Sequence, residues 1–287
     1  MEIFQLLKYG FIQNAFTAAL LMSVSCGIIG TYIVSRRMVF ISGGITHASF
    51  GGVGMGYFLG IPPLAGAAVF AVLAALTTEN LTRKKVIRND SIIAIMWSLG
   101  MALGIIFVYL TPGYAPNLMS FLFGSIITVT STDLWFMFSL TLTVLFFFIV
   151  FFRPILYISF DEQFAKTRGI PVMLLNYLLI VLVALTIVLS IRIAGIILVL
   201  SILTIPQNIA NIFTNRFSVI MITSVILGFA ASIMGLVISY FLDIPSGATI
   251  IFFLVIMYLA ARVVKVLTFG KKYPTEKKSA YEPSENR

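Results

Sequence analysis

Long apolar runs separated by short links constrain this chain more than any other feature of its sequence. A helix needs about 20 mainly apolar residues to cross the hydrocarbon core of a bilayer, and nine runs of about that length follow one another between residues 14 and 267. Only 10% of the residues are charged, against about 25% in soluble domains. The sequence therefore predicts an all-α, polytopic membrane protein with about nine spans, in a range of eight to ten.

The predicted spans and domains follow directly from these runs. Residues 1–267 are expected to form one transmembrane domain, and the polar residues 268–287 a cytoplasmic tail without fixed structure. The short run 118–128 is too short to span and predicts a re-entrant or interfacial piece. The nine predicted spans cover residues 14–34, 40–60, 62–78, 91–109, 132–152, 174–190, 193–211, 218–242 and 247–267.

Basic residues give the predicted orientation, because Lys and Arg are enriched in cytoplasmic links. With nine spans, only Lys8 and Arg192 fall on one side, and the other seventeen of the nineteen Lys and Arg residues fall on the opposite side. This places the N-terminus outside and the C-terminus in the cytoplasm. The net charge of +9 is then explained by topology and lipid headgroups, and no nucleic-acid partner is expected. The seventeen are Arg36, Arg37, Arg83, Lys84, Lys85, Arg88, Arg153, Lys166, Arg168, Arg216, Arg262, Lys265, Lys271, Lys272, Lys277, Lys278 and Arg287.

Several chemistries are excluded by residue counts. Cys26 is the single cysteine and His47 the single histidine, so one copy holds neither a disulfide nor a multi-histidine metal site. The pattern G-x-x-x-x-G-K-[ST], which cradles nucleotide phosphates, is absent from the sequence. We therefore expect no enzyme activity and no stably bound cofactor in this chain, and any ATP must be bound by another chain.

His47 is the candidate residue for a transport pathway. It is the only ionisable residue near the middle of a predicted span, and such residues usually mark a pathway. Gly43, Gly44, Gly51 and Gly54 stand at helical spacing from His47, which predicts a helix face cleared of side chains around the imidazole. The alternative is a histidine that only bonds a neighbouring helix.

Small residues also recur every four positions along the same predicted span. Gly44, Ala48, Gly52, Gly56 and Gly60 form this stripe, which allows another helix to approach closely. We expect the stripe to serve mainly helix packing.

Polar residues cluster in the predicted span 193–211. A proline inside a helix frees a carbonyl, and consecutive amides in lipid need partners. These side chains either line a cavity or bind helices together, and the pattern does not separate the two. The cluster is Ser201, Thr204, Pro206, Gln207, Asn208 and Asn211, of which Thr204, Gln207 and Asn208 are the predicted pathway residues.

Asp243 stands in the predicted outer turn 243–247, between the last two spans. A carboxylate there could meet an arriving cation. An ordinary turn residue is equally compatible with the sequence.

One cytoplasmic link predicts a short helix over about 159–169. Ser159 and Glu162 fit a capping box, and Gly169 fits a helix stop. Phe160 and Phe164 lie one turn apart, and exposed phenylalanines on a lone helix suggest docking to a partner. The alternative is an interfacial helix that inserts these rings into lipid.

Three segments together resemble the permease subunits of zinc- and manganese-type ABC importers. They are Ser42–Gly54, Phe160–Pro171 and Gly195–Pro206, and the resemblance extends over about residues 10–267. It implies a homodimeric membrane core, a cytoplasmic ATP-binding subunit docked on Phe160, Glu162, Phe164 and Gly169, and an external metal-binding protein.

The resemblance implies import of a divalent metal ion, zinc, manganese or iron, with His47 as a transient ligand. Many members of that family carry an aspartate four residues before the histidine, where this chain has Gly43. Many also read Pro-Ala-Ala-Thr-Ala where this chain reads Pro-Gln-Asn-Ile-Ala from Pro206. The missing carboxylate favours zinc over manganese, since carboxylate oxygen is the harder ligand. The alternatives are an ABC permease for a metal chelate and a secondary carrier driven by an ion gradient.

Overall fold

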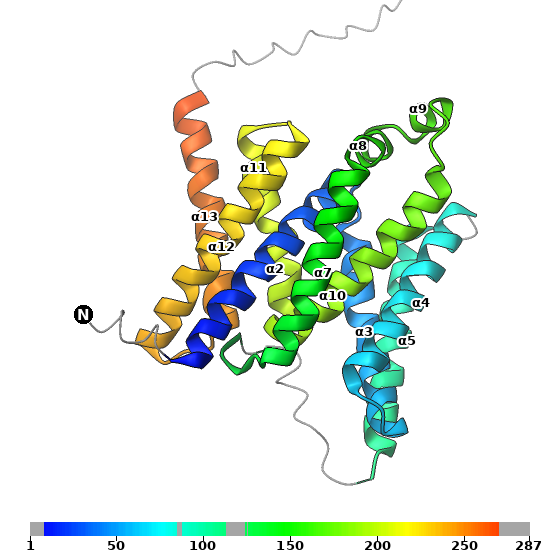
Figure 1. Cartoon of the computed structure of the whole chain (residues 1–287), viewed down its shortest axis with the longest axis vertical. Coiled ribbons are helices and arrows are strands. Elements are labelled where there is room, and N and C mark those ends of the chain that lie inside the picture. The colour runs from blue at the N-terminus through cyan, green and yellow to red at the C-terminus, as the bar shows by residue number, and fades with distance from the viewer. Residues whose placement is uncertain (1–8, 85–87, 113–123, 125, 270–287) are drawn as a thin grey trace, which may run out of the picture.

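The computed structural model describes residues 9–84, 88–112, 124 and 126–269. Every regular element in these ranges is a helix (Figure 1). The tail from residue 270 and most of the short run 118–128 lie outside the described residues. The elements are α2 (Gly10–Ser35), α3 (Val39–Leu59), α4 (Pro63–Arg83), α5 (Asn89–Leu110), the 3-10 helix η1 (Ile126–Thr128), α7 (Ser131–Val150), α8 (Phe152–Phe160), α9 (Glu162–Thr167), α10 (Val172–Ile202), α11 (Ile205–Phe213), α12 (Phe217–Leu242) and α13 (Ser246–Phe269).

The predicted number of nine spans is wrong. Seven helical segments in the described residues are long and apolar enough to cross a membrane. The predicted spans 174–190 and 193–211 merge into one segment, which covers α10 and α11. Helix α3, of 21 residues, is not one of these seven segments. Run length therefore overstated the number of crossings.

The two runs merge because α10 continues through the predicted boundary between them. Gly195 has φ 77° and ψ 166° inside α10, a backbone conformation essentially restricted to glycine, so the segment bends there while its helical hydrogen bonding resumes. Pro206 lies in the first turn of α11, where its missing N–H has no helical partner to lose. The proline expected inside the span 193–211 therefore lies at the start of a helix.

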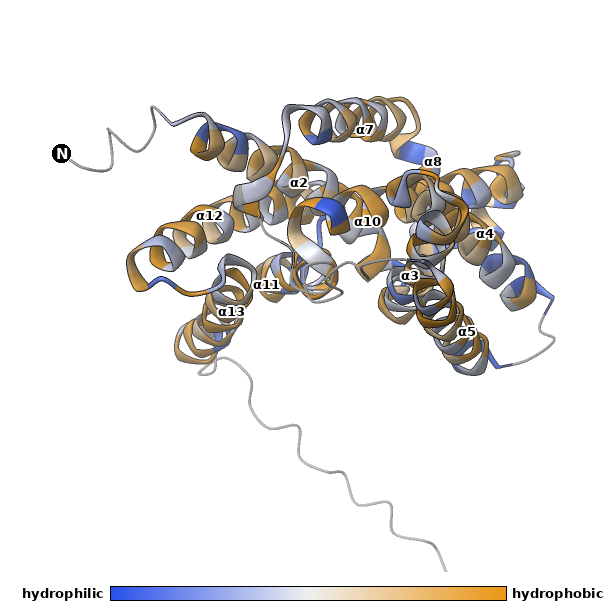
Figure 2. Ribbon diagram, turned by 90° about the horizontal axis from the view of Figure 1, so that it is seen from below, coloured by the Kyte–Doolittle hydropathy of each residue, from blue (hydrophilic) through white to orange (hydrophobic). Residues whose placement is uncertain are grey.

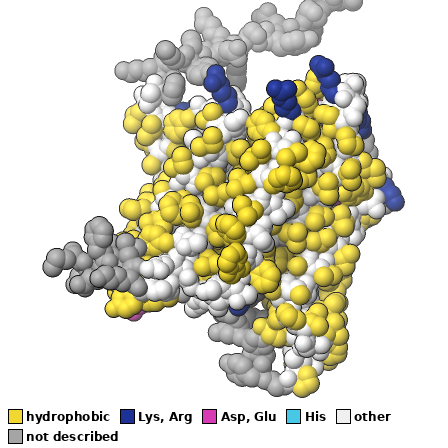
Figure 3. Space-filling view, in the orientation of Figure 1, with side chains coloured by type: hydrophobic (Ala, Val, Ile, Leu, Met, Phe, Trp, Pro, Cys, Tyr) yellow, Lys and Arg dark blue, Asp and Glu magenta, His cyan; other side chains and the backbone are white. Residues whose placement is uncertain are grey.

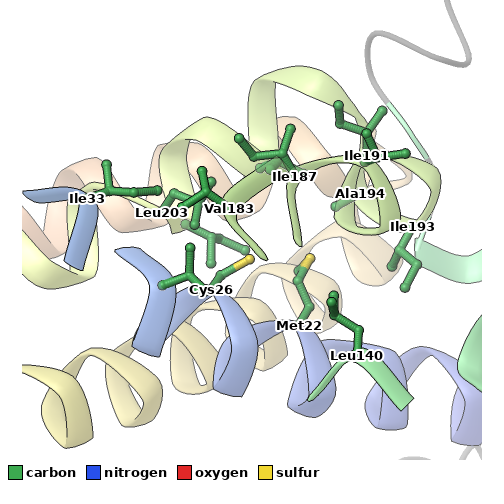
Figure 4. Close-up of a cluster of buried hydrophobic side chains, with 14 of the residues drawn as sticks. Met22, Cys26, Ile33, Leu140, Val183, Ile187, Ile191, Ile193, Ala194 and Leu203 are labelled. Carbon is green, nitrogen blue, oxygen red and sulfur yellow. The ribbon is translucent and has the colours of Figure 1, made fainter. Parts of the chain in front are cut away.

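Helix α10 forms the centre of the bundle. It contacts α2, α3, α4, α7 and α13, and in Figure 2 it lies between the α3–α5 group and the α2, α12 and α13 group. Buried side chains from α2, α7 and α10 interlock around Met22 and Ile187, both fully buried (Figure 4). This apolar core holds the two groups of helices together.

Glycines bring α3 close to its two neighbours. A Cβ at Gly52 would collide with the backbone of Gly66 on α4, and a Cβ at Gly100 on α5 would collide with the backbone of Ala48. Close backbone approach of this kind is the usual role of small-residue stripes in membranes. The expected packing role of the stripe fits these contacts.

The surface agrees with a membrane environment. Hydrophobic side chains cover the middle of the face in Figure 3, and Lys and Arg side chains gather at its upper end. Helices α8 and α9 and the C-terminal end of α13 lie at that same upper end in Figure 1. The chain is a membrane protein, and the Lys and Arg side chains visible on this face lie mainly at one end of the bundle.

The predicted capping box of the short helix is wrong in its residues. Ser159 lies inside α8, where its hydroxyl donates to the Ile155 carbonyl at 2.7 Å. The N-cap of α9 is Asp161, whose carboxylate accepts from the backbone N–H groups of Gln163 at 2.9 Å and Phe164 at 3.0 Å. Because α8 continues to Phe160, the N-cap of the short helix lies two residues later than predicted. Gly169, with φ 72°, follows the end of α9 as predicted.

Candidate functional site

The imidazole of His47 is stacked against an indole ring from another helix. His47 lies on α3 and Trp97 on α5, with ring centroids 3.9 Å apart and ring planes 8° apart. His47 is half-buried. Stacking covers a face of the imidazole but leaves both ring nitrogens free at its edge, because their lone pairs or protons lie in the ring plane.

One nitrogen of His47 is buried without a partner. Its Nδ1 makes no hydrogen bond to any residue that the structure describes. A buried polar atom left unpaired costs free energy, and such atoms in native structures usually indicate a bound water, ion or functional role. Neutral imidazole nitrogen is a common metal ligand, so this atom fits a passing metal ion.

The glycines near His47 have two different roles. A Cβ at Gly43 would meet only the tip of the Trp97 ring, at 4.0 Å, so there is open space beside the imidazole at this position. A Cβ at Gly44 would press on Ile93, and one at Gly51 on the backbone of Gly100. Only Gly43 among these three therefore leaves room beside His47, and the others pack against α5.

Gln207 binds helices together rather than lining an open cavity. Its side chain is fully buried, and its amide donates to the Cys26 carbonyl at 3.1 Å and the Ile202 carbonyl at 3.2 Å. A Cβ at Gly30 would collide with this amide, which shows how closely α2 approaches. Gln207 therefore fits the alternative in which the polar cluster binds helices together.

Asn208 fits the alternative in which the polar cluster lines a cavity. It is exposed, donates to the Thr204 carbonyl at 2.8 Å and, with Tyr258 of α13, lines a cavity of about 340 Å³. The Thr204 hydroxyl donates within its own segment, to the Leu200 carbonyl at 2.7 Å. Helix α11 lies across α10 from α3, the helix that carries His47 (Figure 1), so one protomer does not bring the two groups of predicted pathway residues together.

Asp243 is distant from His47. It is the exposed, left-handed residue that ends α12, with φ 52°. The turn between α12 and α13 lies on the opposite side of the bundle from α3 (Figures 1 and 2). Within one protomer these two residues therefore do not form a common site.

A cavity of about 390 Å³ lies between α3, α4, α7 and α10. Asp133 and Arg192 line it and form an ion pair at 3.4 Å. The guanidinium already neutralises the carboxylate, so this cavity is poorly suited to a cation. The described residues also contain no group of three or more His, Cys, Asp or Glu side chains arranged to hold a metal.

The end of α8 and helix α9 present phenylalanines at the basic end of the bundle. Phe160 is 67% exposed and Phe164 is 40% exposed. Phe164 packs edge-on against Tyr157, at 5.4 Å between centroids, and the Arg168 guanidinium lies over its ring. Beside α9, an apolar hollow of about 480 Å³ is lined in part by Met173. These residues form the α9 surface, defined here as Phe160, Phe164 and the hollow beside them.

Glu162 turns away from that surface and into the bundle. Its Oε1 accepts from Arg36 at 3.2 Å, from Arg83 at 3.3 Å and from the Asn176 amide. Partial burial opposes ionisation of Glu162, but the hydrogen bond from Asn176 and the two guanidiniums outweigh it and hold the pKa of this carboxyl below its usual value. Arg83 also pairs with Glu79 at 2.6 Å. We call these five residues the Glu162 network.

Sequence reasoning missed Trp97 and most of the Glu162 network. The Glu79–Arg83 pair has the i,i+4 spacing of a helical ion pair, and Asn176 is a lone amide in an apolar run, so both carried a signal. Trp97 carried none, since an aromatic residue in a membrane helix is ordinary.

Known proteins resemble this chain over nearly its whole length. The model of the ABC 3 transport family matches residues 8–265. An uncharacterized membrane protein of Synechocystis, slr2045, is 43% identical over 89% of this chain and 91% of its own length. The manganese transport system membrane protein MntC of Halalkalibacterium halodurans is 36% identical over 86% of this chain and 85% of its own.

A solved structure shows the same fold. PsaBC from Streptococcus pneumoniae, in complex with Fab, superposes with a TM-score of 0.81 at 32% identity, covering 90% of this chain and 93% of that one. The family match extends over far more than half of the chain, and the relatives are well above 30% identical. The chain therefore belongs to the ABC 3 transport family, and its resemblance to the permease subunits of metal ABC importers is confirmed.

Proposed function

We propose that this permease moves manganese into the cytoplasm, and that the ion passes beside His47. The observation that carries this proposal is the buried Nδ1 of His47, which has no partner in the described residues. Relatives described as manganese transport proteins support manganese as the cargo. Zinc is the second candidate, because Gly43 supplies no carboxylate beside the imidazole and hard oxygen ligands favour manganese.

The site is suited to transient contact rather than to storage. A single imidazole per chain makes a weak site, and conduction needs binding weak enough to release the ion. A second copy of the chain would bring a second His47 to a shared path. No stably bound cofactor is proposed, and the divalent metal is the substrate.

Family membership supports the predicted partners: a cytoplasmic ATP-binding subunit, an external metal-binding protein and a second copy of the chain. We propose that ATP is hydrolysed in the partner subunit and that this subunit docks on the α9 surface. The exposed phenylalanines and the hollow of about 480 Å³ beside them offer an apolar contact of the kind found at interface cores.

The end that carries α9 is proposed to face the cytoplasm of a bacterial inner membrane. The concentration of Lys and Arg side chains at that end (Figure 3) fits the positive-inside rule. The C-terminal end of α13 lies at this end in Figure 1 and the start of α2 at the other. The N-terminus is then outside and the C-terminus inside.

The proposal is tested by uptake into proteoliposomes that contain the complete transporter. Radioactive Mn²⁺ and Zn²⁺ are compared for the parent and for His47→Ala. We expect His47→Ala to lower uptake of the cargo metal at least tenfold, which corresponds to about 1.4 kcal/mol, because it removes the nitrogen ligand.

The matched control is Ser49→Ala on the same helix. Ser49 is fully buried, and its hydroxyl donates to the Thr46 carbonyl of the same helix, at 2.6 Å. This variant is expected to transport at nearly the parental rate. Equal transport by His47→Ala and the parent would make His47 a packing residue, and uptake of zinc without manganese would reverse the choice of cargo.

A further inference from the structure

Glu162 is the one acidic residue of α9 itself, and it faces the bundle instead of the α9 surface. Three donors converge on its Oε1, and each comes from a different helix or helix end: Arg36 after α2, Arg83 at the end of α4, and Asn176 on α10. The carboxylate therefore ties a six-residue surface helix to three long helices of the membrane core.

We propose that Glu162 is a positioning residue that couples movement of α9 to α2 and α4 during transport. This inference rests on the proposed docking of the ATPase subunit on the α9 surface. Glu162 itself is not part of that contact. It is the attachment through which a displacement of α9 reaches the membrane helices.

The first attachment runs through Arg36. One arm of its guanidinium donates to Glu162, and the other donates to the Ile158 carbonyl of α8 at 2.8 Å. The last carbonyls of a helix lack helical partners, so Arg36 satisfies one of them. Arg36 follows α2 directly, and α2 is largely buried in the core. The α8–α9 corner therefore cannot move away from α2 without breaking both bonds.

The second attachment runs through Arg83. It bridges Glu79 on its own helix and Glu162 on α9. Helix α4 in turn contacts α3 where Gly66 meets Gly52, five residues after His47. A continuous series of contacts thus leads from α9 through α4 to the helix that carries His47.

The charges of the network balance, with two guanidiniums and two carboxylates. Glu162, Arg36 and Arg83 are each only 22–31% exposed, so their interaction is screened less than that of surface ions. Loss of the Glu162 charge leaves both guanidiniums without their shared partner, while the neutral amide of Gln can still accept one hydrogen bond. The substitution Glu162→Gln therefore weakens the attachment and leaves the α9 surface intact.

The experiment measures coupling in the complete transporter reconstituted with its ATPase subunit and external binding protein. For Glu162→Gln we expect the ATPase subunit to co-purify as with the parent and ATP hydrolysis to persist. We expect Mn²⁺ or Zn²⁺ taken up per ATP hydrolysed to fall at least about fivefold. A purely structural role for Glu162 would instead lower the yield of the complex and leave this ratio unchanged.

Asp161→Asn is the matched control, because it removes one negative charge from the neighbouring residue and keeps the N-cap, for which Asn is as suitable as Asp. It should leave the ratio at the parental value. Arg83→Lys is a second test variant: a single ammonium keeps the charge but replaces the guanidinium fork that bridges Glu79 and Glu162, and the ratio should again fall.

A parental ratio in both Glu162→Gln and Arg83→Lys overturns the proposal. An equal fall of the transport-to-ATP ratio in Asp161→Asn and Glu162→Gln also overturns the proposal. Loss of any negative charge near α9 would then explain the effect. Docking is judged separately, by co-purification with a Phe164→Asp variant, so failure of the proposed docking and failure of this inference are distinguishable.

Discussion

The indole of Trp97 lies nearly parallel to the imidazole of His47, with 3.9 Å between the ring centroids. Because Trp97 comes from α5 and His47 from α3, the stack fixes the orientation of the imidazole relative to a second helix. A Cβ at Gly43 would lie 4.0 Å from the Trp97 ring, so a larger side chain at this position could reach the space beside the stacked rings.

Replacement of Trp97 by alanine should weaken transport by releasing the imidazole. An aromatic pair contributes about 0.5–1.5 kcal/mol beyond burial, which corresponds to a roughly two- to tenfold loss of metal uptake. Trp97→Phe keeps a ring over His47 and should stay within about twofold of the parent. Equal uptake by the alanine and phenylalanine variants would show that the stack does not position His47.

The orientation can be tested by labelling introduced cysteines. Ser131 and Asn89 are both exposed, and they begin helices at opposite ends of the bundle (Figure 1). The native Cys26 is buried and should add little background. A membrane-impermeant maleimide should label Ser131→Cys in intact cells, and Asn89→Cys only after permeabilisation. The reverse pattern would invert the proposed orientation.

A charge placed on the α9 surface should prevent the ATPase subunit from docking. Phe164→Asp introduces a carboxylate into an apolar contact, where an unpaired charge is strongly unfavourable. We expect co-purification of the ATPase subunit to be lost while the permease remains in the membrane fraction. Thr167→Asp, on the same short helix, serves as the control for added charge. Undiminished co-purification with Phe164→Asp would mean that α9 lies on lipid.

The Glu162 network should make stability depend on pH at the acidic end. The pKa of Glu162 is lowered in the folded protein, with Arg36, Arg83, Glu79 and Asn176 as the groups around it. Its stabilising contribution is therefore complete above the unfolded pKa of about 4.3 and is lost as pH falls through the lower folded pKa. The melting temperature of the purified permease should fall over this range by more in the parent than in Glu162→Gln. Parallel pH profiles of the two proteins would contradict this assignment.

The contact between α3 and α5 should not tolerate a methyl group at Gly100. The added Cβ would collide with the backbone of Ala48, and overpacking of this kind costs about 1–3 kcal/mol. Gly43→Ala is the control, because the nearest atom to its Cβ lies 4.0 Å away. Thermal unfolding in detergent should show a clear decrease for Gly100→Ala and little change for Gly43→Ala. Similar melting temperatures would mean that the two helices can separate freely.

The sequence by itself determined the class of the protein and several local features. Apolar runs and scarce charge required a helical membrane protein, and Gly169 marked a helix end because a left-handed residue there favours glycine. His47 was identifiable as a candidate because it is a single ionisable residue within an apolar run. These properties depend on composition and on near neighbours in the chain, which the sequence displays directly.

Tertiary structure decided which face of each helix meets which neighbour. Hydropathy cannot distinguish a helix face that meets lipid from one that meets another apolar helix, so it did not show that Gly51 packs on α5 while Gly43 leaves space beside His47. Nor did it show that the runs 174–190 and 193–211 form one merged segment. Glu162 fitted a local cap in the sequence, but Arg36 and Arg83, far away in the chain, draw its carboxylate into the bundle. Such partners are set by the packing of distant helices, which no local pattern contains.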